Sequence, residues 1–182
     1  MMNLKKFLAC ALAVTALLSA SACGNGTTQN TTPNGMIGIS GDIVDYDLYV
    51  PDSWIADEAS GAVSAYRSSE DPTSISMMTW SLPYSDSTLA DWWTMYQEDF
   101  TLVFDDFTLV SNENVLLDGT PAEKYVYTGR LGDTVYRYTQ IAAVRNTAVY
   151  LLTMTELDAI SEETSATHLE ELTKILDNFR WR

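Results

Sequence analysis

Cysteine and histidine, the residues that most often form metal sites and activated nucleophiles, are scarce in this sequence. Its 182 residues include two cysteines and one histidine. Cys10 lies within the first 22 residues, and Cys23 follows them directly. If the chain is cut before Cys23 and that thiol is modified, the remainder can form no disulfide, thiolate metal site or cysteine nucleophile. The lone histidine, His168, excludes a histidine-rich metal site and offers at most one general base.

Positive charge is also scarce. The chain has 10 Lys and Arg against 25 Asp and Glu, which gives a formal net charge of −15. Lys5 and Lys6 belong to a leading segment without acids, so a chain beginning at Cys23 has a net charge of 8 − 25 = −17. An acidic surface repels nucleic-acid phosphates and is not attracted to anionic lipid. We therefore expect no nucleic-acid partner, and any membrane contact must have another cause.

Motifs for phosphate binding and serine hydrolysis are missing as well. The sequence has no G-x-x-x-x-G-K-[ST] loop, no G-x-G-x-x-G loop and no G-x-S-x-G elbow. Carboxylates that bind hard cations are plentiful, with Asp42, Asp45 and Asp47 close together and Asp105 next to Asp106. The first group lacks the spacing of an EF-hand loop, so we expect no specific metal site. We also expect no cofactor and no enzymatic activity.

Residues 1–22 are typical of an export signal. The short positive start MMNLKK precedes the apolar run FLACALAVTALL, which is too short for a comfortable membrane span and is followed by small residues. The stretch Ala20–Cys23, ASAC, resembles the bacterial lipobox, in which small residues precede an invariant cysteine. Ala20 stands where that pattern prefers leucine.

The lipobox resemblance implies that the Cys23 thiol receives a diacylglyceryl group and that the signal is removed directly before it. Acyl chains such as palmitate would then hold the protein on the extracytoplasmic face of a bacterial cell membrane, because two chains anchor stably where one does not. The alternative is an ordinary secretory signal cut near Ala22, with Cys23 left as a free thiol. Gly, Asn and Thr dominate the next residues, so residues 23–41 are predicted to be a lipidated cysteine and a flexible tether.

Residues 42–182 are predicted to form one domain of strands and two helices. The first helix spans 87–104, where Thr88 and Asp91 have the spacing of a capping box. The second helix begins after Ser161, which can cap it. The dipeptide Gly132-Asp133 is typical of a two-residue hairpin turn. Runs rich in β-forming residues predict strands at 46–50, 62–68, 73–83, 107–118, 122–131, 134–145 and 148–157.

Apolar periodicity indicates which side chains of the helices are buried. Trp92 and Trp93 in the first helix are expected to pack against the sheet rather than form a ligand platform. His168 is expected at the surface or boundary, on the flank of the second helix. Trp54 is expected in the core, with an exposed anchor for a partner as the alternative. The predicted buried stripe of the second helix consists of Leu169, Leu172, Leu176 and Phe179, with Ile175 beside it.

This order of elements predicts an α+β fold. Consecutive hairpins favour an antiparallel sheet of about six to seven strands, on which two main amphipathic helices pack. The pattern does not determine whether the helices cover one face of the sheet or both.

The region from Asp42 to Arg182 resembles the PsbP-like domains, a group that shares its fold with a Ran-binding nuclear import factor and with DcrB-type bacterial lipoproteins. One departure is Ser53, where those families usually have glycine. The resemblance implies the PsbP-like architecture and a tendency toward protein binding, and the families share no catalytic residues. The matching phrases are YDLYVPDSW (Tyr46–Trp54), LLDGTPAEKYVYT (Leu116–Thr128), YTQIAAVRNTAVYLLTMT (Tyr138–Thr155) and ILDNFR (Ile175–Arg180).

The first hypothesis is therefore a membrane-anchored, extracytoplasmic lipoprotein with a non-catalytic protein-binding or accessory domain and an unknown protein partner. The second is a small-molecule or ion-binding lipoprotein whose pocket lies between sheet and helix, lined by residues such as Trp80, Trp93 and Tyr127. The third is a hydrolase that uses acidic residues. Apart from the lipidation site at Cys23, the sequence identifies no ligand-binding residue.

Overall fold

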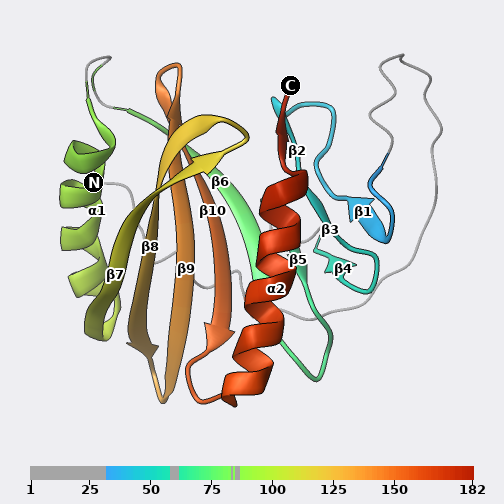
Figure 1. Cartoon of the computed structure of the whole chain (residues 1–182). Helices are drawn as coiled ribbons and strands as arrows, with labels where there is room; N and C mark the ends of the chain where they lie inside the picture. The colour runs from blue at the N-terminus through green and yellow to red at the C-terminus, as the bar shows by residue number, and fades with distance from the viewer. Residues whose placement is uncertain (1–31, 58–61, 83, 85–86) are drawn as a thin grey trace.

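The computed structural model describes residues 32–57, 62–82, 84 and 87–182 of the chain. Two helices, α1 (Leu89–Val103) and α2 (Glu162–Asn178), pack against one large sheet (Figure 1). The strands of this sheet are β4 (Ile55–Ala56), β5 (Val63–Tyr66), β6 (Ser74–Ser81), β7 (Asp105–Leu117), β8 (Thr120–Leu131), β9 (Thr134–Arg145) and β10 (Ala148–Leu157). They form a seven-stranded antiparallel sheet in the order β4-β5-β6-β10-β9-β8-β7, which confirms the predicted fold class.

Tight turns join the last four strands of the sheet. Asp118 and Gly119 connect β7 to β8 with φ values of 44° and 78°. Positive φ at both central residues is the requirement of a type I′ turn, whose twist matches the strands that it joins. Gly132-Asp133 connects β8 to β9 as predicted, and Asn146 begins the turn from β9 to β10 with a φ of 57°. These local turns place β7, β8, β9 and β10 side by side.

Helix α1 begins with the predicted capping box. The Asp91 N–H donates to Thr88 Oγ1 over 3.1 Å, and the Thr88 N–H donates back to Asp91 Oδ2 over 2.9 Å. The helix buries Trp92, Trp93 and Phe100 against the sheet. Trp92 and Trp93 are adjacent and Phe100 lies two turns after Trp93, so the three side chains form one broad face of the helix.

Helix α2 begins at the predicted cap, where the Thr164 N–H donates to Ser161 Oγ over 3.1 Å. Its buried face differs from the predicted one, since Leu169 is 46% exposed. The buried residues at this face are His168, Leu172, Ile175 and Phe179. Their spacing of four, three and four residues is also helical, so the true stripe is shifted by one residue at two of its four positions.

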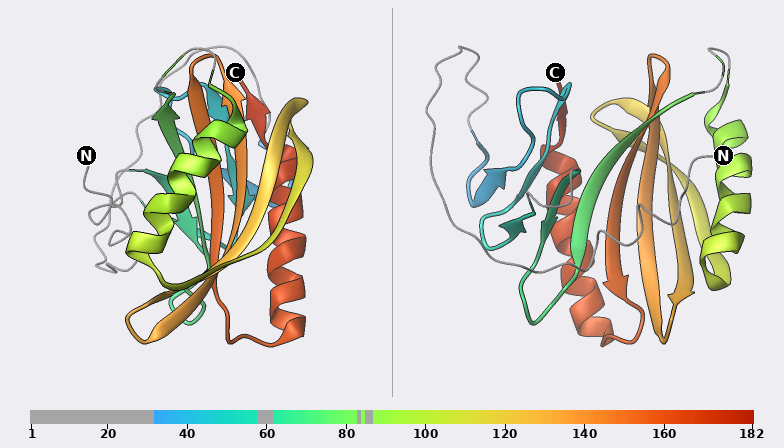
Figure 2. Two further views of the ribbon diagram at one scale, coloured as in Figure 1. Left: turned by 90° about the vertical axis from the view of Figure 1, so that its left-hand side faces the viewer. Right: turned by 180° about the vertical axis from the view of Figure 1, so that it is seen from behind.

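The two helices cover opposite faces of the sheet. Ala142 of β9 and Leu151 of β10 pack with the aromatic residues of α1. Their neighbours Ile141 and Leu152 pack with the buried residues of α2. Because successive side chains of a strand point to opposite faces, the helices must lie on different sides, as Figure 2 shows. Among the helices of the described ranges, none is long and apolar enough to cross a membrane.

Short strands near the two ends of the domain lie beside the sheet. β1 (Met36–Gly38) pairs with β3 (Tyr49–Pro51), and β2 (Tyr46–Asp47) pairs with β11 (Arg180–Trp181). The strand predicted over 46–50 is therefore two short strands with different partners. Residues 36–38 were assigned to the tether from sequence, but Met36 and Ile37 pack against the core of the domain. The folded region thus extends to β1.

Candidate functional site

The lipidation site predicted from the sequence, Cys23, lies outside the described residues, as do residues 1–22 of the predicted signal. Anchoring through Cys23 therefore stays a prediction.

The space between α1 and the sheet, which the second hypothesis assigned to a ligand, is occupied by aromatic rings. Trp93 stacks on Tyr125 with ring centroids 3.7 Å apart and 10° between the ring planes. Tyr127 is buried and stacks on Tyr138 with centroids 5.0 Å apart. Trp80 packs against the same cluster. The adjacent tryptophans of α1 belong to the core, as predicted, and the three residues proposed to line a pocket are packing residues.

Three of the five acidic residues singled out from the sequence are engaged by other side chains. Among the described residues, no group of three His, Cys, Asp or Glu is arranged to hold a metal ion. Asp42 joins no such group. The observed contacts are those of Asp45 with the Tyr150 hydroxyl and Arg145, of Asp47 with Arg182, and of Asp106 with Arg130.

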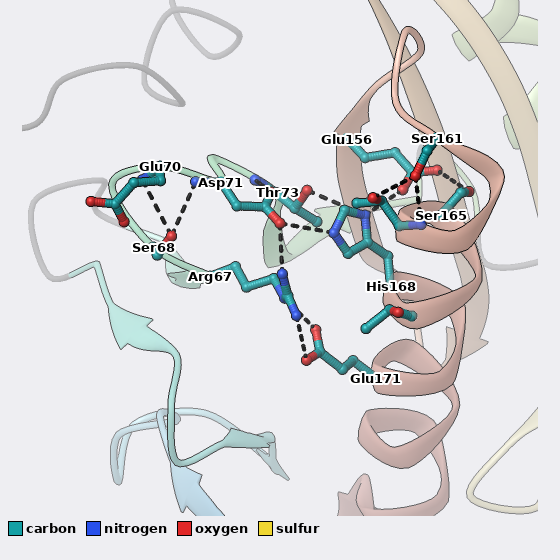
Figure 3. Close-up of polar contacts among 12 residues, drawn as sticks. Arg67, Ser68, Glu70, Asp71, Thr73, Glu156, Ser161, Ser165, His168 and Glu171 are labelled. Carbon is teal, nitrogen blue, oxygen red and sulfur yellow. Dashed lines mark hydrogen bonds and ion pairs between the residues drawn. The ribbon is translucent and has the colours of Figure 1, made fainter.

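His168 is fully buried between two carboxylates, so the expectation of a surface or boundary histidine is wrong. Figure 3 shows the ring of His168 on α2 facing Glu156 at the end of β10 and Asp71 in the loop before β6. Nδ1 lies 2.8 Å from Glu156 Oε2, and Nε2 lies 2.9 Å from Asp71 Oδ2. The Thr73 hydroxyl lies 3.5 Å from Nδ1. The shifted helix face places the ring in the interior, where these polar groups surround it.

Arg67 extends this network along α2. Its Nη1 donates to Asp71 Oδ2 over 2.8 Å, while its Nε donates to Glu171 Oε2 over 2.9 Å. Glu171 also accepts a hydrogen bond of 3.3 Å from the indole N–H of Trp54. The network therefore ties the loop that follows β5 to two successive turns of α2.

The neighbours of Asp71 stabilise its ionised form. A carboxylate only accepts hydrogen bonds, so a ring nitrogen of His168 that carries a proton donates it to the carboxylate that it faces. Burial raises the pKa of Asp71, but hydrogen bonds from Thr73, Arg67 and His168 outweigh burial and hold that pKa well below its usual range. Asp71 is thus held as an anion, with the Arg67 guanidinium beside it.

This network has the properties of a structural element rather than of a catalytic site. A general base must reach the proton that it removes from a substrate, whereas His168 has no exposed surface. Its partners instead come from two other elements, β10 and the loop before β6, which these contacts hold to α2. The network is therefore assigned to stability, and a binding function must be sought at the surface.

The longest strand of the sheet, β7, forms one of its two edges, and the two-residue strand β4 forms the other (Figure 1). In the described part of the chain, β7 pairs with β8 and with no other strand. Almost all of its 13 residues are exposed, on both faces of the sheet. Leu109, Val110 and Leu116 are large apolar side chains exposed on β7, and Leu116 is 69% exposed. An edge strand presents unpaired N–H and C=O groups, so β7 can accept a further strand.

The turn between β7 and β8 determines which backbone groups are free. A two-residue hairpin closes on a pair that exchanges backbone hydrogen bonds, here Leu117 and Thr120. The alternate pairs direct their N–H and C=O groups away from β8. Pro121 belongs to such a pair, which suits its lack of an N–H. The outward-directed residues of β7 in this region are Asn112, Asn114 and Leu116.

A pocket of about 320 Å³ lies between this part of β7 and the start of α1. Its lining includes Thr88, Leu89, Asn114, Pro121, Glu123 and Val144. Glu123 is the charged residue of the lining. Asn114 belongs both to the pocket and to the free edge, so the two features form one continuous candidate site.

Glu123 is held in place from inside the domain. Its Oε2 accepts hydrogen bonds from the Tyr125 hydroxyl and, over 3.2 Å, from Asn112 Nδ2. Burial and the hydrogen bond to Glu123 raise the pKa of Tyr125, so the phenol keeps the proton that it donates. The Tyr125 ring is in turn stacked on Trp93. The aromatic core thus positions the one carboxylate of the pocket.

The positive charges beside β7 come from β8, where Arg130 pairs with Asp106. No Lys or Arg occurs between Arg67 and Lys124, a stretch that includes α1 and β7. Lys124 itself forms an ion pair with Glu113 on β7. The acids of α1 and β7 are Asp91, Glu98, Asp99, Asp105, Asp106 and Glu113. The stretch without Lys or Arg is visible in the sequence, but only the structure shows that it includes a strand at the edge of the sheet.

Sequence comparison finds no matching family model and no matching curated protein. Solved structures match the whole domain. The cyanobacterial PsbP protein CyanoP from Synechocystis sp. PCC 6803 superposes with a TM-score of 0.59, at 16% sequence identity, over 86% of this chain and 98% of that one. The fold is PsbP-like. The similarity extends over nearly the full length of CyanoP, so no large part of that fold is missing here.

Two further PsbP-like neighbours come from other organisms. LpqN of Mycobacterium tuberculosis, described as involved in cell envelope biogenesis, has a TM-score of 0.56 and 18% identity, over 74% of this chain and 81% of its own. The Ran-binding protein Mog1p of Saccharomyces cerevisiae has a TM-score of 0.54 and 11% identity, over 80% and 95%. At such low identities, the likeness shows a shared fold and not a shared task.

Proposed function

We propose that this chain is a lipid-anchored, extracytoplasmic accessory protein whose PsbP-like domain is not an enzyme and binds a protein partner along β7. The observation that carries the binding role is the long, exposed β7, which pairs on one side only. When a peptide adds to a sheet edge, main-chain hydrogen bonds supply affinity and neighbouring pockets supply specificity. The pocket at Asn114 provides the second of these features.

The proposed location rests on the start of the sequence. The export-signal pattern of residues 1–22 and the lipobox resemblance at Ala20–Cys23 support anchoring on the outer side of a cell membrane. LpqN, which has the same fold, is described as involved in cell envelope biogenesis, and Mog1p as Ran-binding. Both descriptions are compatible with a domain that assists other proteins.

Metabolic labelling with a fatty acid tests the anchor. The unchanged chain is expected to incorporate the label, and Cys23→Ala to lose it. Cys10→Ala is the matched control, because this cysteine lies in the segment that processing removes, and it should keep the label. Label that persists in Cys23→Ala would refute anchoring through this residue.

Photo-crosslinking in intact cells tests the binding edge. A photoreactive residue at Leu116, which is exposed on β7, is expected to crosslink to one defined protein. The same group at Leu169, which is exposed on α2, serves as the control and should not give that product. Identical products from the two positions, or none from Leu116, would rule out β7 as the binding edge.

A further inference from the structure

We propose that the occupant of the β7 edge is an extended, basic segment of a partner protein, which pairs with Asn112, Asn114 and Leu116 and inserts a Lys or Arg side chain into the pocket beside Asn114. This inference rests on the proposed binding function and names the chemistry of the partner. Its support comes from the geometry of the edge, the lining of the pocket and the distribution of charge.

The geometry of β7 limits pairing to a short segment. Its first half contains two register shifts, between Asp105 and Thr108 and between Leu109 and Ser111, so its ladder there is irregular. At the other end, the carbonyl of Leu117 accepts a hydrogen bond of 3.1 Å from the Trp181 indole. The regular, accessible edge therefore runs from Ser111 to Leu116. An added strand needs about six residues to cover it, at roughly 3.3 Å per residue.

The side chains of an added strand would alternate between the two faces of the sheet. On the α1 face they meet Asn112, Asn114 and Leu116 and the adjoining pocket, whereas Glu113 stands on the opposite face. Every second side chain of the partner is therefore directed to the face that carries the pocket, and the one beside Asn114 can enter it. The register of pairing therefore determines which residue of the partner enters the pocket.

The pocket suits a long cationic side chain. Leu89, Pro121 and Val144 provide apolar walls, and the Glu123 carboxylate provides the charge. The side chains of Lys and Arg match this lining, because each has an aliphatic stem and a charged end. Tyr125 and Asn112 both donate their hydrogen bonds to Oε2 of Glu123. In this proposal, Oε1 is the oxygen that accepts a hydrogen bond from the partner's cation. A cation bound there would form a charge-assisted hydrogen bond.

The surrounding charge favours the same partner and opposes a second copy of this chain. Neither α1 nor β7 contains Lys or Arg, so their own side chains carry only negative charge, part of which Lys124 and Arg130 of β8 neutralise. A second copy of this chain carries the same formal net charge of −15, so pairing two β7 edges works against repulsion between like charges. A basic segment is instead attracted to this edge, and its association would be accelerated by the charge of the domain.

Fluorescence polarisation with the full chain in neutral detergent tests the proposal. The probe is a labelled peptide of about nine residues in which Lys alternates with Val and Thr, residues that favour extended strands. A matched peptide with Glu in place of Lys is the charge control. The Lys peptide is expected to bind more weakly as salt rises, and the Glu peptide not to bind. Alternate N–H groups of a paired peptide face β7, and the others face away from it. N-methylation of the N–H groups that face β7 should abolish binding, whereas N-methylation of the other set should not.

Variants of the chain test the pocket. Glu123→Gln is expected to weaken binding of the Lys peptide about tenfold, the effect of losing one good charged contact. Glu170→Gln, which removes a carboxylate from the exposed side of α2, is the matched control and should leave affinity unchanged. Equal losses in both variants, or binding that is insensitive to both N-methylation patterns, would mean non-specific attraction and overturn the proposal.

Hydrogen exchange separates this inference from the proposed function. The bound Lys peptide is expected to protect the N–H groups of Asn112, Asn114 and Leu116. If the Glu peptide protects them instead, or if the chain dimerises through these residues in sedimentation, the basic partner is wrong and β7 remains a binding edge. If no peptide protects them and Leu116 crosslinks to nothing in cells, the binding function itself fails.

Discussion

Nδ1 of His168 lies 2.8 Å from Oε2 of Glu156, and both side chains are buried. The two residues belong to α2 and β10, so their contact fixes the start of the helix to the end of the strand that precedes it. Asp71 reaches the opposite nitrogen of the ring from the loop before β6. One side chain thus joins three elements, which no apolar residue at position 168 would do through directed bonds.

Removal of the ring is expected to destabilise the domain strongly. His168→Ala removes the ring that contacts the buried Glu156, and leaving a buried polar group without its hydrogen-bond partner costs about 1–3 kcal/mol. Urea denaturation of the purified chain measures this loss. The control is Leu169→Ala at the neighbouring exposed position, where a change of about 0.5 kcal/mol or less is expected. Similar losses in the two variants would show that the network adds nothing beyond helix propensity.

The low pKa of Asp71 predicts a loss of stability in acid. Its pKa in the folded protein lies below the ordinary value of 3.8, so the stabilisation is present above that pH and is lost as the pH falls below it. We expect the difference in unfolding free energy between the unchanged chain and Asp71→Asn to be largest at about pH 7 and to shrink toward about pH 2.

Asp133→Asn, in the exposed turn between β8 and β9, is the charge-matched control for this experiment. Urea denaturation at several pH values provides the measurement. A difference between the unchanged chain and Asp71→Asn that stays constant with pH would contradict the role of the ionised carboxyl group.

Much of the fold could be predicted because its signals are local. The capping box of Thr88 and Asp91 and the turn at Gly132-Asp133 involve neighbouring residues, and both occur as expected. The position of β7 at the sheet edge had no such signal. Hairpins place the consecutive strands β7, β8, β9 and β10 side by side. The pairing of β10 with β6 joins segments far apart in the sequence, and it determines that β7, rather than β10, lies at the edge of the sheet.

The buried network was missed for a different physical reason. A buried face that begins at Leu169 and one that begins at His168 both follow helical spacing. The prediction chose Leu169 because its side chain is apolar. The partners that make a buried His168 acceptable are remote, since Asp71 is 97 residues away in the sequence. Periodicity detects apolar faces, whereas a polar residue is buried only when distant groups satisfy its hydrogen bonds.

Gly129 of β8 is expected to tolerate no side chain. A Cβ at this position would lie 2.5 Å from Cγ of Phe104, within the ring cluster under α1. Gly129→Ala should therefore lower the free energy of unfolding by about 1–3 kcal/mol through overpacking. Gly41→Ala is the control, because no heavy atom lies within 4 Å of its added Cβ. Thermal denaturation compares the two, and equal melting temperatures would refute this packing constraint.

Trp54 tests how the core and the polar network are joined. The residue is 3% exposed, so the sequence-based expectation of a core position is confirmed. Its ring packs in the cluster under α2, while its indole N–H donates to Glu171, which also binds Arg67. Trp54→Ala should cost about 3–5 kcal/mol, the usual loss for a buried aromatic ring.

Trp54→Phe separates the two contributions, because it keeps most of the ring and removes the N–H donor. The Glu171 carboxylate still has Arg67 as a partner, so the loss of one hydrogen bond should cost only about 0.5–1.5 kcal/mol. Urea denaturation of both variants gives the comparison. If Trp54→Phe destabilises the domain as much as Trp54→Ala, the hydrogen bond to Glu171 dominates. If neither variant changes the stability, the core role of Trp54 is refuted.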